Sequence, residues 1–273
     1  MTRYAVMFER CTGRGEGALG AFLMLGDPGI AQGEAYLDAL VEGGADMVEL
    51  GIPFSDPIAD GPVIQAAALR ALRAGVRTAD CLAIVSRFRS RHPSVPVGIL
   101  TYANIVAARG IERFAGQLAA AGADSMLVAD VPSLEARPYA AAARKVGIDP
   151  VMIAAPNTPD EVIGRIADLS SGYTYCVARA GVTGADAELA LDHGRLFATL
   201  AAAGAPPPVL GFGIASPEHV TEALAHGAAG VISGSALVDQ VARGQTPAGL
   251  AGFVARLKAA TAGQRLDFAS AAF

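Results

Sequence analysis

The stretch GGADMVELG, residues 43–51, decides the fold, because its pattern returns three more times along the chain. In each copy a helical segment ends at a glycine, a short turn follows, and a compact apolar run has the composition of a buried strand. The chain therefore repeats one helix-to-strand step. The copies are GGADMVELG (43–51), AGADSMLVAD (121–130), VGIDPVMIAA (146–155) and HGAAGVISG (226–234).

Four further apolar runs complete a set of eight predicted strands, each followed by a helical pattern. The strands are too uniformly apolar for a sheet with one face in water, which favours parallel strands covered by helices. Eight such units in about 250 residues, with no polar linker between them, predict an α/β fold, a (β/α)8 TIM barrel. A doubly wound open sheet is the structural alternative. The further runs are GAFLML (20–25), VPVGILTY (95–102), YTYCVAR (173–179) and PPVLGFG (207–213).

Both chain ends fall outside the repeating pattern. The first dozen residues predict an extra helix before the first strand, and residues 262–273 predict a weakly ordered tail. We expect residues 1–273 to form a single barrel domain.

Composition excludes several classes of function. The net charge of −5 provides no basic face for nucleic acid. No apolar run approaches the roughly 20 residues of a membrane-spanning helix, and Glu9 and Arg10 interrupt any signal peptide, so we expect a cytoplasmic protein. The three cysteines form no CxxC pattern and predict neither a disulfide framework nor a zinc site.

Three acidic residues gather in ELGIPFSDPIADGP (49–62) without a Lys, Arg or His beside them. Strand alternation puts Met47, Glu49 and Gly51 on one side. If that side faces the barrel interior, apolar surroundings raise the pKa of Glu49 and suit it to proton transfer. The alternative is a Glu satisfied by structural hydrogen bonds.

The other two acids of this stretch have competing interpretations. Asp60 stands at the end of the loop, either as a functional carboxylate or as the N-cap of the helix that Gly61-Pro62 opens. Asp56, between Ser55 and Pro57, favours a turn or surface role, with a partner contact as the competing interpretation.

Two glycine-rich turns near the end of the chain predict a phosphate site. They are GFGIASPEH (211–219), after the seventh strand, and SGSALV (233–238), after the eighth. Glycines let the backbone approach an anion, and a helix that begins near Ser235 aims its positive dipole end at that anion. This is where barrels of this class commonly bind phosphate.

Residues that are absent narrow the chemistry. Lys145 and Lys258, the only lysines, lie away from the strand ends, so a Schiff-base mechanism lacks its nucleophile. None of the four histidines follows a strand, so no metal site is expected. Carboxylate acid/base chemistry on a phosphorylated small molecule remains, in an apolar pocket that suits a flat ring. The predicted lining is Phe22, Ile64, Leu100, Leu127, Tyr175 and Phe212.

Several long motifs, in collinear order from about residue 4 to 258, make the sequence resemble the tryptophan synthase alpha chain family. The motifs are ELGIPFSDPIADGP with IQAAALRAL (49–72), LGDPG (25–29), YAN (102–104), ADVP (129–132), RAGVTGA (179–185), GFGI (211–214) and GVISGSA (230–236).

The resemblance implies cleavage of indole-3-glycerol phosphate to indole and glyceraldehyde 3-phosphate, a retro-aldol reaction without metal or Schiff base. It implies Glu49 as general acid/base and Asp60 as the carboxylate that stabilises the ring N–H. It also implies that Thr183, in a loop that closes over the substrate, reaches Asp60, and that Phe22 and Tyr175 contact the substrate. The implied phosphate-binding residues are Gly184, Gly213, Gly234 and Ser235.

The resemblance further implies a partner, the tryptophan synthase beta subunit, in an alpha2beta2 heterotetramer. Asp27, Pro53 and Asp56 match surface positions near that partner. Indole would pass to the beta subunit for L-tryptophan synthesis. Pyridoxal phosphate is expected only in the beta subunit, so no cofactor is expected here.

Two other functions remain as alternatives. A stand-alone lyase would release free indole without a partner, because partner dependence lies more in loop dynamics than in residue identity. A non-catalytic barrel could serve only as an activating scaffold for the beta subunit. A sugar-phosphate epimerase is disfavoured because no histidine occupies a strand end.

Overall fold

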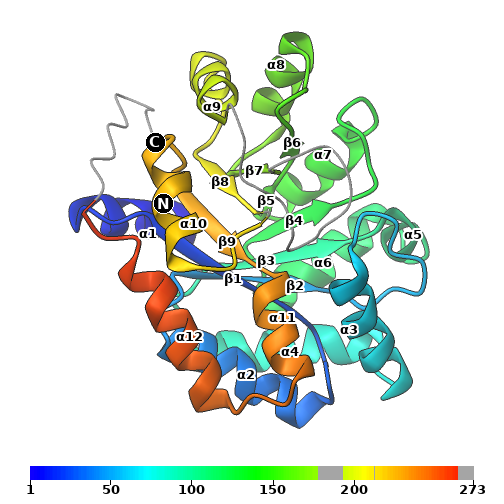
Figure 1. Cartoon of the computed structure of the whole chain (residues 1–273). Coiled ribbons are helices and arrows are strands. Elements are labelled where there is room, and N and C mark those ends of the chain that lie inside the picture. Colours follow the sequence, from blue (N-terminus) through cyan, green and yellow to red (C-terminus); the bar gives the residue numbers. More distant parts are fainter. Residues whose placement is uncertain (178–192, 212, 264–273) are drawn as a thin grey trace.

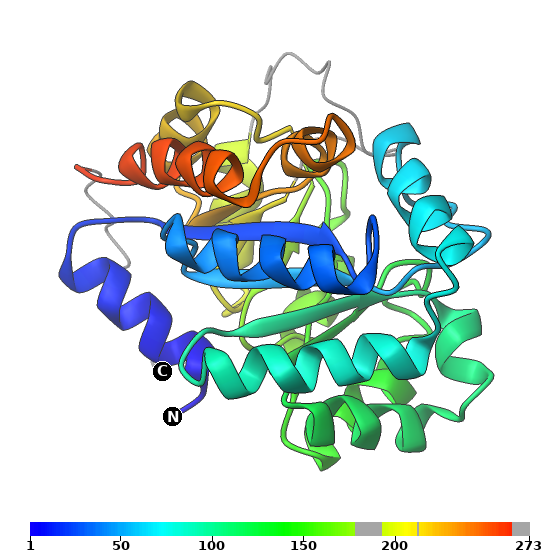
Figure 2. The same ribbon diagram turned by 90° about the horizontal axis from the view of Figure 1, so that it is seen from below.

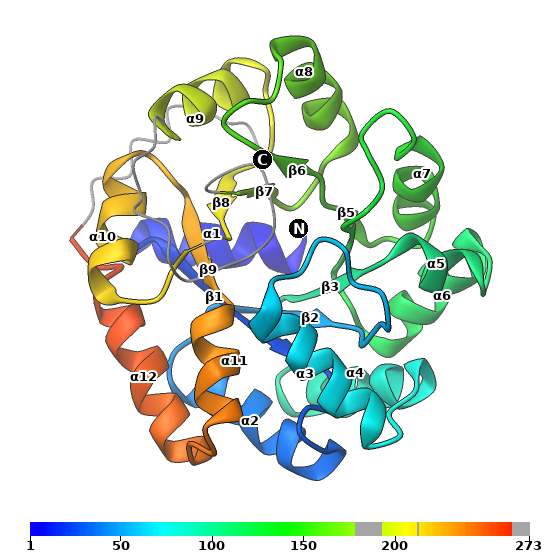
Figure 3. The same ribbon diagram turned by 45° about the vertical axis from the view of Figure 1, so that its right-hand side comes forward.

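The computed structural model shows a ring of parallel strands enclosed by helices, which confirms the predicted (β/α)8 barrel (Figures 1 and 3). It describes residues 1–177, 193–211 and 213–263. Buried apolar side chains from nearly every strand and helix join in one core cluster.

The strands alternate with helices along the chain. The strands are β1 (Ala18–Met24), β2 (Met47–Gly51), β3 (Val97–Thr101), β4 (Ser125–Val128), β5 (Asp149–Pro150), β6 (Ile153–Ala154), β7 (Thr174–Cys176), β8 (Pro208–Leu210) and β9 (Gly230–Ser233). The helices are α1 (Arg3–Gly13), α2 (Ile30–Glu42), α3 (Pro62–Arg73), α4 (Thr78–Arg91), α5 (Ala103–Ala107), α6 (Ile111–Ala121), α7 (Arg137–Lys145), α8 (Asp160–Leu169), α9 (His193–Ala202), α10 (Pro217–Ala225), α11 (Ser235–Ala242) and α12 (Pro247–Ala259).

The fifth barrel strand is interrupted, which explains nine strands in place of eight. The sheet order is β5-β4-β3-β2-β1-β9-β8-β7-β6. Residues 149–151 bond to β4, where Val151 N–H donates to Met126 O. Residues 152–154 bond to β7, where Tyr175 N–H donates to Met152 O. One segment thus joins both ends of the sheet and closes the barrel.

The repeated phrase has a physical basis in each copy. Its glycine follows a helix with a positive φ, a conformation that costs glycine least. In two copies the Asp before the strand accepts a backbone bond from the preceding strand: Asp46 from Leu19 N–H at 2.9 Å and Asp124 from Val97 N–H at 2.8 Å. These bonds tie consecutive βα units together. The glycines are Gly44 (φ 93°), Gly122 (φ 91°), Gly147 (φ 79°) and Gly227 (φ 100°).

Helix α1 is the predicted extra helix, and it lies at the end of the barrel where the strands begin (Figures 2 and 3). At the other chain end, Ala262 bridges to Glu16 and Gly263 N–H donates to Gly15 O. The first two residues of the predicted weak tail are therefore paired, and residues 264–273 lie outside the described residues.

In the part of the chain that the structure describes, no helix is both long and apolar enough to span a membrane.

Replacing Asp124 by Ala should lower the free energy of unfolding by roughly 3 kcal/mol. The Asp124 carboxylate, on a side chain that is 9% exposed, accepts bonds from Val97 N–H and from Arg3 and Arg89, so its loss leaves Arg89, whose side chain is 13% exposed, without its ion pair. Urea unfolding measures the change. Lys145→Ala is the control, because the exposed pair with Glu112 contributes less than about 0.5 kcal/mol. Equal effects of the two substitutions would contradict the prediction.

Candidate functional site

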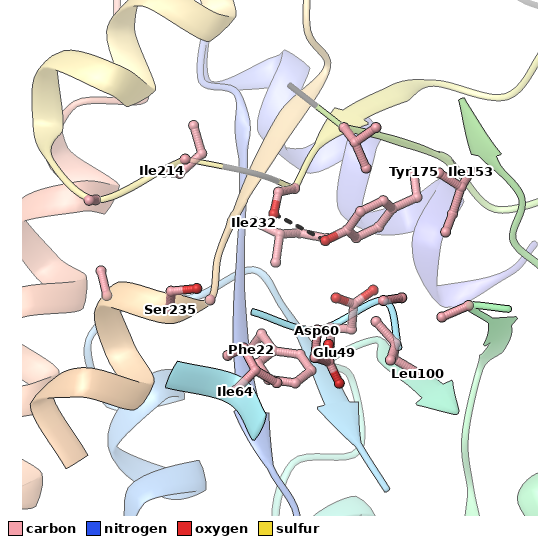
Figure 4. A pocket seen from close by; sticks show the side chains of 18 of the residues that line it. Phe22, Glu49, Asp60, Ile64, Leu100, Ile153, Tyr175, Ile214, Ile232 and Ser235 are labelled. Atoms are coloured by element: carbon pink, nitrogen blue, oxygen red, sulfur yellow. Dashed lines mark hydrogen bonds between the residues drawn. The ribbon is translucent and has the colours of Figure 1, made fainter. Parts of the chain in front are cut away.

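A cavity of about 310 Å³ opens at the end of the barrel where the strands end, and the two predicted carboxylates line it (Figure 4). The walls come from loops and strand ends that are far apart in sequence. The lining residues are Phe22, Glu49, Ala59, Asp60, Ile64, Leu100, Ala129, Ile153, Ala155, Tyr175, Val177, Gly211, Gly213, Ile214, Ala215, Ile232, Gly234, Ser235 and Ala236.

Glu49 sits in the middle of β2 with its side chain inside the barrel, as strand alternation predicts. It is 2% exposed. The Tyr173 hydroxyl donates to Oε1 at 3.0 Å, while the buried Oε2 has no hydrogen-bond partner among the described residues. A carboxyl group that served only structure would have both oxygens satisfied. The unpartnered oxygen therefore favours a functional role.

Asp60 is held at three points beside Glu49. Its N–H donates to Pro57 O, its carbonyl accepts from Gln65 Nε2 at 2.7 Å, and its Oδ2 accepts from the Tyr102 hydroxyl at 2.8 Å. The alternative role as a helix N-cap is wrong, because Gly61 occupies the N-cap of α3. The carboxylate of Asp60 is free to face a ligand.

The two carboxyl groups differ in acidity. Burial raises the pKa of Glu49 to about 8; the Tyr173 hydrogen bond opposes this rise, and the charge of Asp60 adds to it. Burial raises the pKa of Asp60 to about 6, opposed by the Tyr102 hydrogen bond. Near pH 7, Glu49 carries its proton and Asp60 is mostly ionised, a division of labour found in acid/base sites.

The opposite wall of the cavity is suited to an anion. Gly213, with φ 80°, lies there together with Gly234 and Ser235. Helix α11 begins at Ser235 and has no acidic residue in its first turn. Its N-terminal end therefore presents a positive dipole end to the cavity.

The apolar lining agrees with the sequence at four of its predicted positions, Phe22, Ile64, Leu100 and Tyr175. Tyr175 is fixed by its hydroxyl, which donates to Gly211 O at 3.0 Å (Figure 4). The prediction for Leu127 is wrong: this residue is buried in the core and does not line the cavity. Ala129, two residues further along, lines it instead, because a side chain on the same face must also reach the correct depth.

Three predicted residues lie outside the described residues. Phe212, expected in the apolar lining, Thr183, expected in the loop, and Gly184, expected at the phosphate, therefore stay predictions.

Two of the three predicted surface positions near a partner are buried. Asp27 is 5% exposed and forms a two-bond ion pair with Arg70 of α3. Pro53 is buried just after β2, before the loop reaches the surface. As surface positions these two are therefore wrong, since Arg70 of α3 covers Asp27 and Pro53 is buried; their place in a partner interface stays a prediction. Asp56 is exposed, as predicted.

Tyr102 and Tyr173, which hold the two carboxylates, were missed from the sequence. Tyr102 stands in the YAN motif, but nothing in the motif indicates contact with Asp60, 42 residues away. Tyr173 begins an apolar run whose composition is that of a buried strand. Both are nearly inaccessible to solvent, so a tyrosine directly before or after a strand is the signal that could have suggested them.

Neither lysine lies in the cavity. Lys145 pairs with Glu112 on the surface, and Lys258 pairs with Glu16 and Asp46 where the strands begin. Among residues 1–177, 193–211 and 213–263, no group of three or more His, Cys, Asp or Glu side chains is arranged to hold a metal ion.

A (β/α)8 barrel whose cavity is lined by two buried carboxyl groups of unequal acidity and by the N-terminal end of a helix has the arrangement of an acid/base enzyme. Comparison with known proteins narrows this class. The family model described as tryptophan synthase alpha chain matches residues 8–264. The chain belongs to the tryptophan synthase alpha chain family.

Individual relatives agree over nearly the whole chain. The tryptophan synthase alpha chain of Klebsiella pneumoniae is 50% identical, covering 96% of this chain and 99% of its own length. That of Shewanella amazonensis is 51% identical over 88% and 91%. Among solved structures, the tryptophan synthase of Mycobacterium tuberculosis superposes with a TM-score of 0.87 at 33% identity, covering 95% of this chain and 98% of that one.

Glu49→Gln should stabilise the protein increasingly as pH rises. The folded pKa of about 8 exceeds the value of 4.5 expected in the unfolded chain, so wild-type stability is complete below pH 4.5 and falls as pH rises toward 8. Between pH 5.5 and 8.5 the advantage of the variant should grow by roughly 3 kcal/mol, measured by urea unfolding. Asp60→Asn is the control. Its advantage in free energy of unfolding should grow by less than about 1 kcal/mol over the same pH range, because the Asp60 pKa is near 6. If the difference in free energy of unfolding between Glu49→Gln and wild type stayed constant with pH, the raised pKa of Glu49 would be contradicted.

Proposed function

We propose that this chain cleaves indole-3-glycerol phosphate to indole and glyceraldehyde 3-phosphate by a retro-aldol reaction, as a carbon–carbon lyase. The observation that carries the proposal is the pairing of Glu49 and Asp60 at one end of an apolar cavity whose other wall is the N-terminal end of α11. A molecule with a flat ring and a phosphate on a short chain matches both ends of this cavity.

Glu49 serves as general acid and then as general base. Its neutral carboxyl group donates a proton to C3 of the indole ring, which leaves positive charge on the ring nitrogen. The resulting carboxylate takes the proton of the side-chain hydroxyl as the carbon–carbon bond breaks. The bonding electron pair returns to the ring, and the aldehyde is released. The proton balance closes within Glu49, which a pKa near 8 suits.

Asp60 stabilises the charge that develops on the ring nitrogen. It is ionised near pH 7 and accepts the ring N–H in the charged intermediate. A lysine or arginine beside it would cancel this effect, and the stretch 49–62 contains neither. Phe22, Leu100 and Tyr175 hold the ring between them.

Gly213, Gly234 and Ser235 hold the phosphate, with Gly184 as the fourth member of this set. The loop 179–185 closes over the substrate, with Thr183 reaching Asp60. Closure would exclude water from the charged intermediate.

The partner is the beta subunit of tryptophan synthase, in an alpha2beta2 assembly that receives the indole. Exposed apolar side chains at the cavity end of the barrel support this part of the proposal: Ile58 is 74% exposed on the loop after β2, and Leu134 is 69% exposed on the loop after β4. Asp56 is exposed on the first of these loops. A partner that covers these side chains would remove their apolar surface from water.

No cofactor takes part in the proposed reaction on this chain. Glu49 and Asp60 supply the acid, the base and the charge stabilisation that the cleavage requires. Pyridoxal phosphate serves the later reaction with serine and is assigned to the beta subunit.

The purified chain should release indole from indole-3-glycerol phosphate, and Glu49→Gln and Asp60→Asn should each lower kcat at least about 100-fold. The amides keep the shape of the side chains but cannot exchange the proton or carry the charge. Indole formation is measured directly, and circular dichroism checks folding. Near wild-type cleavage by either variant would sink the role assigned to that residue.

Adding a beta subunit should raise the rate of indole release manyfold, and Leu134→Asp should raise the beta-subunit concentration needed for half-maximal stimulation at least about tenfold. Val6→Asp is the matched control, because Val6 is an exposed apolar residue on α1, at the opposite end of the barrel. Fast cleavage that ignores the partner would instead indicate a stand-alone lyase.

A further inference from the structure

The extra helix α1 sends one polar side chain into the barrel. Tyr4, in its first turn, is 1% exposed, and its hydroxyl is within 2.8 Å of Ser125 Oγ at the start of β4. A helix that only sealed the barrel could do so with apolar side chains alone. A buried hydroxyl pair calls for a further explanation, because it has given up its hydrogen bonds to water.

The strand register connects this hydroxyl pair to Glu49. Glu49 of β2 pairs with Gly98 of β3, and Gly98 pairs with Ser125 of β4. These three residues form one row across adjacent strands, so their side chains occupy the same layer of the barrel interior. The middle residue has no side chain and leaves a gap between the catalytic carboxyl group and the serine.

Three hydroxyl groups converge on that gap. A Cβ atom at position 98 would lie 3.0 Å from Tyr4 Oη, 3.0 Å from Ser125 Oγ and 3.5 Å from Tyr173 Oη. The rings of Tyr4 and Tyr173 are in contact, with centroids 5.2 Å apart and planes inclined by 56°. Tyr173 in turn donates to Glu49 Oε1 at 3.0 Å. We name Tyr4, Ser125 and Tyr173 the hydroxyl cluster.

We propose that the hydroxyl cluster is the positioning device of Glu49, so that helix α1 is part of the catalytic site and not only a plug. The proposal rests on the proposed function. Tyr4 confines the ring and hydroxyl of Tyr173, and Tyr173 fixes Oε1 of Glu49, while Oε2 has no partner among the described residues. Tyr4 and Ser125 act through Tyr173 and are positioning residues.

A purely structural role would change stability and leave the protonation of Glu49 alone. The hydrogen bond from Tyr173 opposes the rise in the Glu49 pKa. If the cluster holds that bond in place, loosening the cluster raises the Glu49 pKa and shifts the alkaline limb of the cleavage rate to higher pH. The pH dependence therefore separates the two roles.

The test is Tyr4→Phe, which removes the hydroxyl and keeps the ring. In the complex saturated with beta subunit, kcat for indole release should fall about three- to tenfold, and the alkaline limb should move up by about half a pH unit. Tyr36→Phe is the matched control: Tyr36 is also 1% exposed, and its hydroxyl donates to Gln245 O at 2.7 Å, on α2 outside the barrel. Tyr36→Phe should lower the free energy of unfolding without moving the alkaline limb of the pH–rate profile.

A double variant tests the route of the effect. If Tyr4 acts through Tyr173, adding Tyr4→Phe to Tyr173→Phe should cost no further activity. Gly98→Ala is a second, independent variant, since its methyl group would displace the hydroxyls from the gap and should move the limb in the same direction. Two results would overturn the proposal. One is that the losses of activity multiply in the double variant, and the other is that Tyr4→Phe leaves the alkaline limb of the pH–rate profile at the same pH as Tyr36→Phe does.

The outcomes also separate this proposal from the function on which it rests. If wild-type protein releases no indole, the proposed function fails. If wild type, Tyr36→Phe, Tyr4→Phe and Gly98→Ala all release indole with one pH profile, only the positioning role fails.

Discussion

The rest of this structure depends on one constraint: a carboxyl group without an ion pair among the described residues is buried inside a closed ring of strands. Glu49 occupies a position in β2 where alternation turns its side chain into the barrel interior, and no Lys or Arg lies within the stretch 49–62 to neutralise it. Desolvation then favours the neutral acid near pH 7. The Tyr173 hydroxyl holds Oε1 and opposes the rise in pKa, while Oε2 is buried without a partner among the described residues.

Asp60 shows how a neighbouring carboxyl group acquires the opposite state. It stands on a loop at the rim instead of within a strand, so burial raises its pKa less, to about 6. Backbone bonds and the Tyr102 hydroxyl fix its position without adding a positive charge. Two chemically similar residues thus become an acid and an anion because one is on a strand and the other on a loop.

The barrel separates stability from chemistry along its axis. Where the strands begin, Asp46 and Asp124 bind backbone N–H groups and nearby cations, and Lys258 ties α12 to that end. Where the strands end, Glu49 and Asp60 have no ion pair among the described residues, and Gly213 and Gly234 line the cavity. The ion pairs at the first end allow the second to hold groups that destabilise the fold at high pH.

The sequence by itself determined the barrel, the strand order along the chain, the extra helix and the two carboxyl groups, because glycine-ended helices, apolar runs and strand alternation are local patterns. Only the tertiary structure decided which residues meet. It put Ala129 at the cavity in place of Leu127, buried Asp27 against Arg70, and brought Tyr102 to Asp60 and Tyr173 to Glu49. Depth in the barrel and contacts across 42 to 124 residues depend on strand register and helix packing, which no local pattern encodes.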